Sequence, residues 1–322
     1  MLPGRLCGGA KILWCKTFKR RIPVVLNLEV TSRCNYSCEY CAYTGSGEKL
    51  SAEEIKELIT QAEKLGTEKI ILTGGEPLLR ERIGEIVVHA KNQDMEVNLN
   101  TNGSLVKEKI NEIKDVNNLV FSLDGGGDYM DKMCAKDSFQ KVIEGIKSAK
   151  KRDVDCAVTA VLTSESREQI GTLMKISQNL KVPLNVQPMV SGEYGLDRLD
   201  LVPSTDDMKR IIEKMREFKR KNPHLVRPSL RTFDLMEKVY FEEGLIKCAA
   251  GKISGRIEGG KLKPCARFPK EVDISNGLKD AWGGIPGTDE CREKCCTGDL
   301  ELSGLWDLNL GVLYNQLMNV RF

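Results

Sequence analysis

The stretch Thr31-Ser32-Arg33-Cys34-Asn35-Tyr36-Ser37-Cys38-Glu39-Tyr40-Cys41 places three thiols at the spacing Cys-x3-Cys-x2-Cys. It directly follows the apolar run Val24-Val25-Leu26-Asn27-Leu28-Glu29-Val30, which predicts a β-strand that ends where the cysteines begin. Thiolates are soft ligands that suit iron–sulfur clusters. Three thiols leave a four-iron cluster one ligand short, so the motif predicts an open iron where a small molecule can bind.

The chain beyond this stretch alternates between apolar, β-branched runs and helical patterns. The runs begin near Val24, Lys69, Met95, Asn118, Val154 and Val182, and the helical patterns cover 51–65, 80–93, 105–115, 138–152 and 166–180. The first helix is the clearest, because Ser51 and Glu54 fit a capping box. Strand followed by helix, repeated along the chain, predicts an α/β fold with a parallel sheet and helices outside. Two further helices are predicted from Ser204 to about Lys221 and over Ser229–Glu243.

Composition sets the limits of the function. The 322 residues, 41% hydrophobic and 30% charged, suffice for one large α/β domain plus an appendage. A net charge of +3 gives no case for nucleic-acid binding, and no run is long and apolar enough to span a membrane. The sequence has two histidines, which argues against a His-based metal site or a Ser–His–Asp triad. Twelve clustered cysteines without a secretory signal predict metal binding in the reducing cytoplasm.

The cysteine motif, with Tyr40 before its last thiol, resembles the signature of the radical S-adenosylmethionine (radical SAM) superfamily. The resemblance implies a partial (β/α)6 barrel of TIM type, open on one side. It implies that Cys34, Cys38 and Cys41 hold a [4Fe–4S] cluster whose open iron is chelated by SAM. One electron from a donor such as flavodoxin or ferredoxin then yields a 5′-deoxyadenosyl radical, which abstracts hydrogen from a substrate. A zinc knuckle is the alternative, although zinc sites usually pair their thiols as Cys-x2-Cys in two halves.

The predicted strand ends carry further motifs, and barrel enzymes build their sites at strand ends. Gly74-Gly75-Glu76-Pro77 resembles the family's GGEP motif, which binds the SAM amino group. Asn100-Thr101-Asn102-Gly103 resembles its TNG turn, and Ser122-Leu123-Asp124-Gly125 its S-x-D-G turn. The alternative for each motif is that it is an ordinary turn, since Asn, Asp and Gly are common in turns of any kind. Together they assign to SAM binding Tyr40, Gly74, Gly75, Glu76, Pro77, Asn102, Ser122 and Asp124.

Two polar residues on later strands are added to this set as candidates for contact with adenosine or substrate. They are Thr159 in the fifth strand and Gln187 at the end of the sixth. Cys156 in the fifth strand is interpreted as a small buried hydrophobe. Cys134 is placed in a loop after the fourth strand, and a radical-quenching role for it is considered but not favoured. No side chain is assigned a catalytic role.

A second cysteine group lies near the C-terminus. A hairpin is predicted over 255–265 between Cys248 and Cys265, and Cys291, Cys295 and Cys296 follow. This layout resembles the SPASM or shorter twitch extension of radical SAM enzymes. It implies one auxiliary [4Fe–4S] cluster on Cys248, Cys265, Cys291 and Cys295, with Cys296 as a replacement for Cys295. A full SPASM extension has seven cysteines and this segment has five. A structural zinc in the same thiols is the alternative.

The predicted organisation has three parts. They are a basic amphipathic segment (1–22), a radical SAM core with its following helices (23–243) and an auxiliary-cluster domain (244–322). The first segment is interpreted as a helix that covers the bottom of the barrel, with peripheral contact to a membrane surface as the alternative.

The sequence leaves the substrate open. A peptide, a lipid and another small molecule are all considered, the lipid because the chain is similar to adenosylhopane synthase-like enzymes. An alternative from a different functional class is a non-catalytic, Cys-rich zinc-binding scaffold. Iron content would separate it from every enzyme hypothesis.

Overall fold

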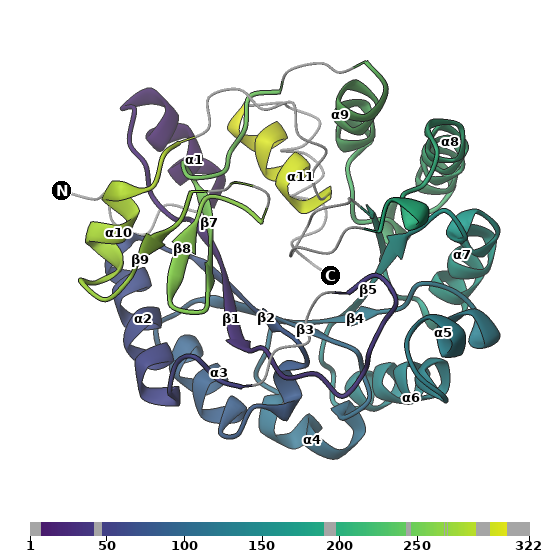
Figure 1. The fold of residues 1–322 in the computed structure, drawn as a ribbon, viewed down its shortest axis with the longest axis horizontal. Coiled ribbons are helices and arrows are strands. Elements are labelled where there is room, and N and C mark those ends of the chain that lie inside the picture. Colours follow the sequence, from purple (N-terminus) through teal and green to yellow (C-terminus); the bar gives the residue numbers. More distant parts are fainter. Residues whose placement is uncertain are drawn as a thin grey trace.

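The computed structural model describes residues 8–41, 47–189, 198–242, 246–266, 268, 270–287 and 297–307, except the side chains of 8–10 and 297–300. Six strands in chain order form neighbouring parallel pairs. They are β1 (Val25–Thr31), β2 (Lys69–Gly74), β3 (Glu96–Thr101), β4 (Asn118–Ser122), β5 (Cys156–Leu162) and β6 (Leu184–Pro188). Figure 1 shows this sheet as an arc with helices along its outer side. The predicted α/β fold is confirmed, and the sheet does not close: β6 forms one edge.

The helices between the strands lie close to their predicted positions. They are α2 (Ala52–Leu65), α3 (Ile83–Asn92), α4 (Val106–Ile113), α6 (Ser138–Lys150) and α7 (Gln169–Leu180), followed by α8 (Thr205–Lys221) and α9 (Leu230–Phe241). Single turns of 3-10 helix accompany them, among them η1 (Pro77–Leu79), η2 (Ser166–Glu168), η4 (Leu199–Leu201) and η5 (Pro223–Leu225). Ser51 and Glu54 form the predicted capping box on α2, and the Ser204 and Ser229 side chains cap α8 and α9.

The helix that follows β4 was not predicted. The structure has α5 (Gly127–Met133) where the sequence suggested a loop after β4, and Cys134 lies at the end of this helix. Seven residues that begin with a glycine are too few to show a 3.6-residue apolar period, so the pattern could not reveal the helix.

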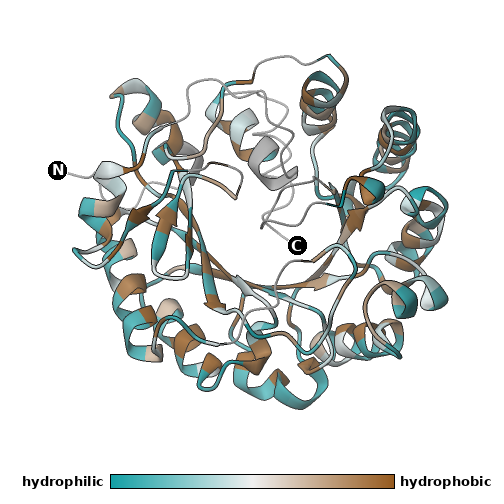
Figure 2. Ribbon diagram, in the orientation of Figure 1, coloured by the Kyte–Doolittle hydropathy of each residue, from teal (hydrophilic) through white to brown (hydrophobic). Residues whose placement is uncertain are grey.

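The main core lies between the sheet and the outer helices. Alternate residues of the strands point to the helices and are buried. Those that are at most 2% exposed include Leu26, Leu28, Ile70, Leu72, Val97, Leu99, Leu119 and Phe121. In Figure 2 the strands and the sheet-facing sides of the helices carry much of the apolar colour. The other residues of the strands face the inside of the arc.

The C-terminal segment extends this sheet. β7 (Ser254–Glu258) pairs with β1 in parallel, and β8 (Lys261–Lys263) and β9 (Val272–Asp273) follow in antiparallel order. The predicted hairpin is confirmed: Gly259 and Gly260 form its turn with φ values of +56° and +82°, which glycine adopts readily. α10 (Leu278–Gly284) follows and contacts α2.

The N-terminal ends of β1 and β7 are covered by α1 (Gly8–Thr17) and α11 (Thr297–Trp306). A second apolar cluster forms there from Ile12, Cys15, Ile22, Val24, Val25, Ala249, Ile253 and Leu305. The sequence predicts that the N-terminal segment is a helix that covers the bottom of the barrel. The position of α1 agrees with that interpretation. No helix within the described ranges is both long and apolar enough to cross a bilayer.

Candidate active site

The loop that follows β1 carries the three-cysteine motif. We refer to residues 32–50, of which 42–46 lie outside the described part, as the cluster loop. Its two ends are joined by Ser32, whose hydroxyl and backbone N–H both donate to Gly47 O, at 2.5 and 3.3 Å. Cys34, Cys38 and Cys41 lie at the C-terminal edge of the sheet and are partly buried.

The Gly74–Gly75 turn packs against this loop. A Cβ atom at Gly74 would lie 2.0 Å from Thr31 O, and one at Gly75 would lie 2.2 Å from Arg33 O. Only glycine fits such close approaches, and Gly74 also has a φ of +139°. The sequence suggested that these glycines let the backbone approach a ligand. In the structure the atoms they approach belong to the backbone of the cluster loop, which they thereby position.

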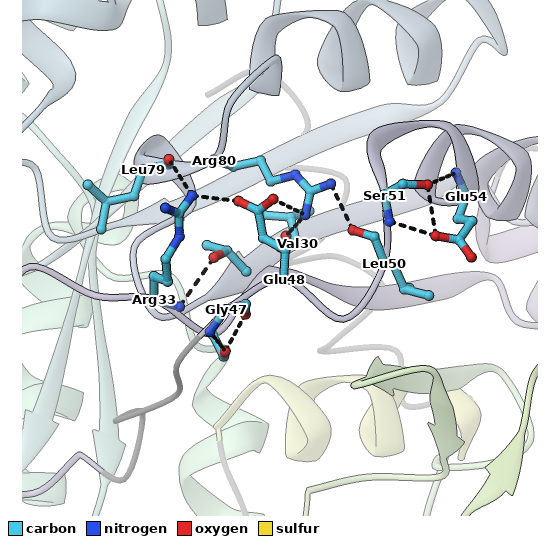
Figure 3. A network of polar contacts seen from close by, with 11 residues as sticks. Val30, Arg33, Gly47, Glu48, Leu50, Ser51, Glu54, Leu79 and Arg80 are labelled. Carbon is cyan, nitrogen blue, oxygen red and sulfur yellow. Dashed lines mark hydrogen bonds and ion pairs between the residues drawn. The ribbon is translucent and has the colours of Figure 1, made fainter.

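A buried arginine holds both stems of the same loop (Figure 3). Arg80 is 2% exposed and donates to Val30 O at 2.7 Å and to Leu50 O at 2.8 Å. Glu48 lies 3.4 Å from Arg80 and 2.6 Å from Arg33, so one carboxylate bridges two guanidinium groups. Burial lowers the pKa of Arg80, and the Glu48 charge opposes that effect. This arrangement fixes where the loop leaves β1 and where it enters α2.

Glu76 connects the ends of β2 and β3. It is fully buried, and its carboxylate accepts hydrogen bonds from Leu78 N at 2.9 Å, Thr101 Oγ1 at 2.9 Å and Asn102 N at 2.7 Å. Burial raises the pKa of Glu76 to about 7, and the three donors oppose this rise. The carboxylate therefore orders two turns of the site, whatever further contact it makes with SAM.

Asp124 connects the cluster loop to β5. It is 1% exposed, accepts a hydrogen bond from the Tyr40 hydroxyl and another from Val161 N at 2.7 Å. Burial raises the pKa of Asp124 to about 6, and these donors oppose the rise. Burial also raises the pKa of Tyr40, with the Asp124 charge as the next cause. Tyr40 is thus held at the top of the sheet by a residue of the S-x-D-G turn.

Asn102 lies directly beside the first cysteine. Its amide nitrogen donates to Asn35 Oδ1 at 2.9 Å and lies 3.9 Å from Cys34 Sγ. Burial raises the pKa of the Cys34 thiol, and the Tyr36 N–H opposes that effect. The structure therefore brings the ends of β1, β2, β3 and β4 together around the cysteine motif.

The sequence allows two kinds of metal centre on the three cysteines, a mononuclear zinc site and an iron–sulfur cluster. Among the described residues, no three His, Cys, Asp or Glu side chains converge on a single metal ion. That geometry offers no mononuclear zinc site here. Each thiolate of a four-iron cluster binds a different iron, so a cluster does not require such convergence, and the donor set of three thiols fits it.

The remaining candidates lie on β4, β5, β6 and η1. Ser122 is exposed at the end of β4, Thr159 is half-buried on β5 and accepts from Asn185 Nδ2 at 3.4 Å, and Gln187 is half-buried on β6. Pro77 begins η1 and is buried. These residues belong to strands, or to a turn after a strand, whose C-terminal ends lie at the same edge of the sheet as the motif residues.

The second cysteine group is only partly described. Cys248 is 6% exposed and precedes β7, and Cys265 is half-buried and follows β8. Because β8 runs antiparallel to β7, both lie toward the N-terminal end of β7. Cys291, Cys295 and Cys296 lie outside the described residues.

Comparison with known proteins agrees with this geometry. Residues 28–176 match the family model of the radical SAM superfamily. The chain therefore contains a radical SAM domain. A [4Fe–4S] cluster and SAM are the cofactors of this superfamily and hence of the protein. The match covers β1 to α7, the part of the chain that holds the cysteine motif and the strand-end turns.

Relatives that match most of the chain are also found. A probable GTP 3′,8-cyclase of Saccharolobus solfataricus is 29% identical over 79% of this chain and 86% of its own. The GTP 3′,8-cyclase of Helicobacter pylori is 24% identical over 80% of this chain and 85% of its own. SuiB of Streptococcus suis, solved with S-adenosylmethionine, has a TM-score of 0.66 and 18% identity over 84% of this chain and 68% of its own. The SuiB likeness shows that the fold is shared.

Sequence reasoning missed two parts of the site. Arg80 lies three residues beyond the recognised Gly74–Pro77 motif, and no spacing rule connects it to the two carbonyl groups it binds. Cys134 was noted, but its contact with the cluster loop depends on α5, which the pattern did not predict.

Proposed function

We propose that the protein is a radical SAM enzyme that acts on a polar, nucleotide-type substrate, with GTP as the first candidate. In this proposal Cys34, Cys38 and Cys41 hold the cluster and the turns after β2, β3 and β4 bind SAM. The cyclase relatives support the substrate class, and the polar interior of the sheet is the observation that carries it.

The interior face of the sheet is polar at the level where strands β1, β3, β4 and β7 lie in register. Asn27 pairs with Arg256 on one side and with Ile71 on the other; Ile71 pairs with Asn98, and Asn98 with Asn118. Directly paired residues of parallel strands point to the same face. Four of the five positions in this row are therefore amides or a guanidinium, where barrel interiors usually carry Val, Ile or Leu.

The next positions toward the C-terminal edge continue this character. Thr73, Asn100 and Asn185 are half-buried, whereas their strand neighbours Leu72, Leu99 and Leu184 on the helix side are fully buried. At these three positions the inner face of the sheet is partly open to solvent, whereas Asn98 and Asn118 of the row before them are buried.

One wall of this interior is charged. Glu258 of β7 accepts a hydrogen bond from Arg256 and forms an ion pair with Lys263 at 3.4 Å. Glu29 of β1 lies close by: burial raises its pKa, the Glu258 charge adds to this rise, and Arg256 and Lys263 oppose it. Such a wall offers charged and hydrogen-bonding partners to a substrate that carries both.

These features argue against the lipid hypothesis. A lipid alkene on this face would displace water from amides and charges without replacing the lost hydrogen bonds, which costs about 1–3 kcal/mol for each polar group. A nucleotide offers a donor–acceptor edge, ribose hydroxyls and phosphate oxygens instead.

The chain's own residues supply positioning. When bound, the cluster and SAM provide the radical chemistry that attacks an unactivated C–H bond. Glu76, Asp124 and Arg80 hold the loops that receive them, and Asn102 and Tyr40 present polar groups beside them. The interior wall then orients the substrate below the strand ends.

We also propose an auxiliary centre on Cys248 and Cys265, completed by Cys291 and by Cys295 or Cys296. Cys265→Ala should lower the iron content while SAM cleavage continues. Zinc in place of iron in the purified protein would contradict an auxiliary iron–sulfur cluster. A flavodoxin or ferredoxin is the proposed electron donor, and the cytoplasm the proposed location.

The direct test is anaerobic incubation of the reconstituted protein with SAM, dithionite and GTP. We expect GTP loss, formation of 5′-deoxyadenosine and a product of unchanged mass with a new bond between the 3′ and 8 positions. The mass is unchanged because the hydrogen atom transferred to the 5′-deoxyadenosyl radical is replaced by one electron from dithionite and one proton from water. ATP serves as the matched control, and Arg256→Met should raise KM for GTP. Formation of 5′-deoxyadenosine with intact GTP would overturn the substrate assignment but leave the radical SAM assignment standing.

A further inference from the structure

A fourth thiol adjoins the cysteine motif. The Cys134 side chain lies beside Cys38 and, together with burial, raises the pKa of that thiol, and Cys134 Sγ lies 4.0 Å from the Tyr40 hydroxyl. Cys134 is half-buried, so the thiol is not enclosed in the apolar core in the way that Cys156 is, with 8% exposure. Four thiols, from the cluster loop and the end of α5, thus share one corner of the site.

The fold holds Cys134 in this place. The backbone N–H of Glu39, between Cys38 and Tyr40, donates to Met133 O at 2.9 Å and so binds the end of α5 to the cluster loop. Within α5, Cys134 N donates to Met130 O at 2.9 Å, and the sulfur of Met130 accepts from Asp124 N at 3.2 Å.

The beginning of α5 is also tied. The Gly126 N–H donates to Gln169 Oε1 at 2.9 Å, which links the helix to α7. The thiol is therefore presented by an element anchored at both ends, and its position follows from the fold.

We propose that Cys134 is a reserve ligand that caps the open iron of the [4Fe–4S] cluster while SAM is absent. The inference rests on the proposed holding of that cluster by Cys34, Cys38 and Cys41. Ligation requires the thiolate, so capping releases one proton. When SAM chelates the iron, Cys134 leaves and takes up a proton, and no electron is transferred. A cluster in which each of the four irons carries a thiolate has no iron open to solvent, which would protect the resting enzyme.

Capping predicts a competition that can be measured. If Cys134 occupies the iron about nine-tenths of the time, its removal should tighten SAM binding roughly tenfold, since only the uncapped fraction binds SAM. Its removal should also speed the loss of the open iron under mild oxidation by a similar factor, because a cluster iron without a protein ligand is the one that is lost.

The experiment compares full-length wild type, Cys134→Ala and Cys156→Ala, each reconstituted anaerobically without SAM. Ferricyanide is added, and the EPR signal of a three-iron cluster is followed with time; SAM affinity is measured in parallel. We expect Cys134→Ala to form the three-iron signal faster and bind SAM more tightly than both other proteins. Cys134→Val, which fills the same space without a ligand, should behave like Cys134→Ala and covers the case in which the alanine variant does not fold.

Two results are decisive against parts of the account. Equal rates and equal SAM affinities in wild type and Cys134→Ala would overturn the capping role alone. If Cys38→Ala retained the full iron content of the wild type, the cluster assignment itself would be wrong.

Discussion

The N-terminal and the C-terminal ends of the sheet strands are stabilised by different interactions. At the N-terminal ends, α1 and α11 cover an apolar cluster in which Ile253 and Cys15 are fully buried. At the C-terminal ends, buried charges organise the loops: Glu76 and Asp124 each receive hydrogen bonds from two or more segments, and Arg80 holds both stems of the cluster loop. Apolar packing tolerates changes in shape, whereas a buried charge requires its partners in defined positions.

This difference separates stability from function. A change at the apolar end should cost folding free energy and leave the chemistry of each folded molecule intact. A change at the charged end should displace the loops that carry the thiols, even where the protein still folds.

The largest effect is expected at Arg80. Arg80→Met leaves two carbonyl groups without their donor and leaves the Glu48 carboxylate with Arg33 alone, which should cost about 3–5 kcal/mol of unfolding free energy. Iron content after reconstitution should fall by more than half, because the stems of the cluster loop lose their link. Iron analysis and denaturant unfolding measure both effects.

The neighbouring Arg82 provides the control for this variant. It is exposed and pairs with Glu53 and Glu85 on the surface, so Arg82→Met should change stability by at most about 1 kcal/mol and leave the iron content unchanged. A similar iron loss in both variants would show that Arg80 has no special role.

A moderate effect is expected at the apolar end. Ile253→Ala removes a fully buried side chain and should cost about 2–4 kcal/mol. Iron content and SAM cleavage per folded molecule should equal those of the wild type. Reduced SAM cleavage in this variant at full folding would mean that the two ends are not separable as described.

The smallest effect concerns pH. The pKa of Glu76 rises from 4.5 to about 7 on folding, so the folded protein binds this proton more tightly than the unfolded chain. The contribution of this proton binding to the stability of the folded state is fully present below pH 4.5 and is lost as the pH rises through about 7. Glu76→Gln should cost about 1–3 kcal/mol at the acid end, because its amide group faces N–H donors.

The stability gap between wild type and Glu76→Gln should therefore narrow as the pH rises across this window. Thermal unfolding of the metal-free proteins at several pH values provides the measurement. A gap that widens with pH would contradict this prediction. It would show that the three donors stabilise the ionised Glu76 carboxylate by more than burial destabilises it.

Much of the fold could be predicted because local patterns determine it. The alternation of β-branched runs and 3.6-period helices located all six strands of the core, and Ser51 with Glu54 marked the start of α2. The pairing of β7 with β1 could not be predicted, since a short strand such as Ser254–Glu258 carries no signal for its partner in a distant part of the chain.

The site was predictable where function resides in a contiguous motif and not where it depends on tertiary contact. The cysteine spacing and the Gly74–Pro77 turn could be recognised in the sequence. The links from Arg80 to Val30 and from Cys134 to Cys38 join residues 50 and 96 positions apart, and only the folded chain brings them together.

The most direct test of the account is SAM cleavage by the protein in which Cys34, Cys38 and Cys41 are all changed to alanine. Anaerobically reconstituted protein is mixed with SAM and dithionite, and 5′-deoxyadenosine and iron are measured together. The account predicts that the wild type forms 5′-deoxyadenosine, and that the triple variant forms none and has lost one cluster's iron. Continued SAM cleavage by a folded triple variant would contradict the assignment of this loop as the site of the reaction.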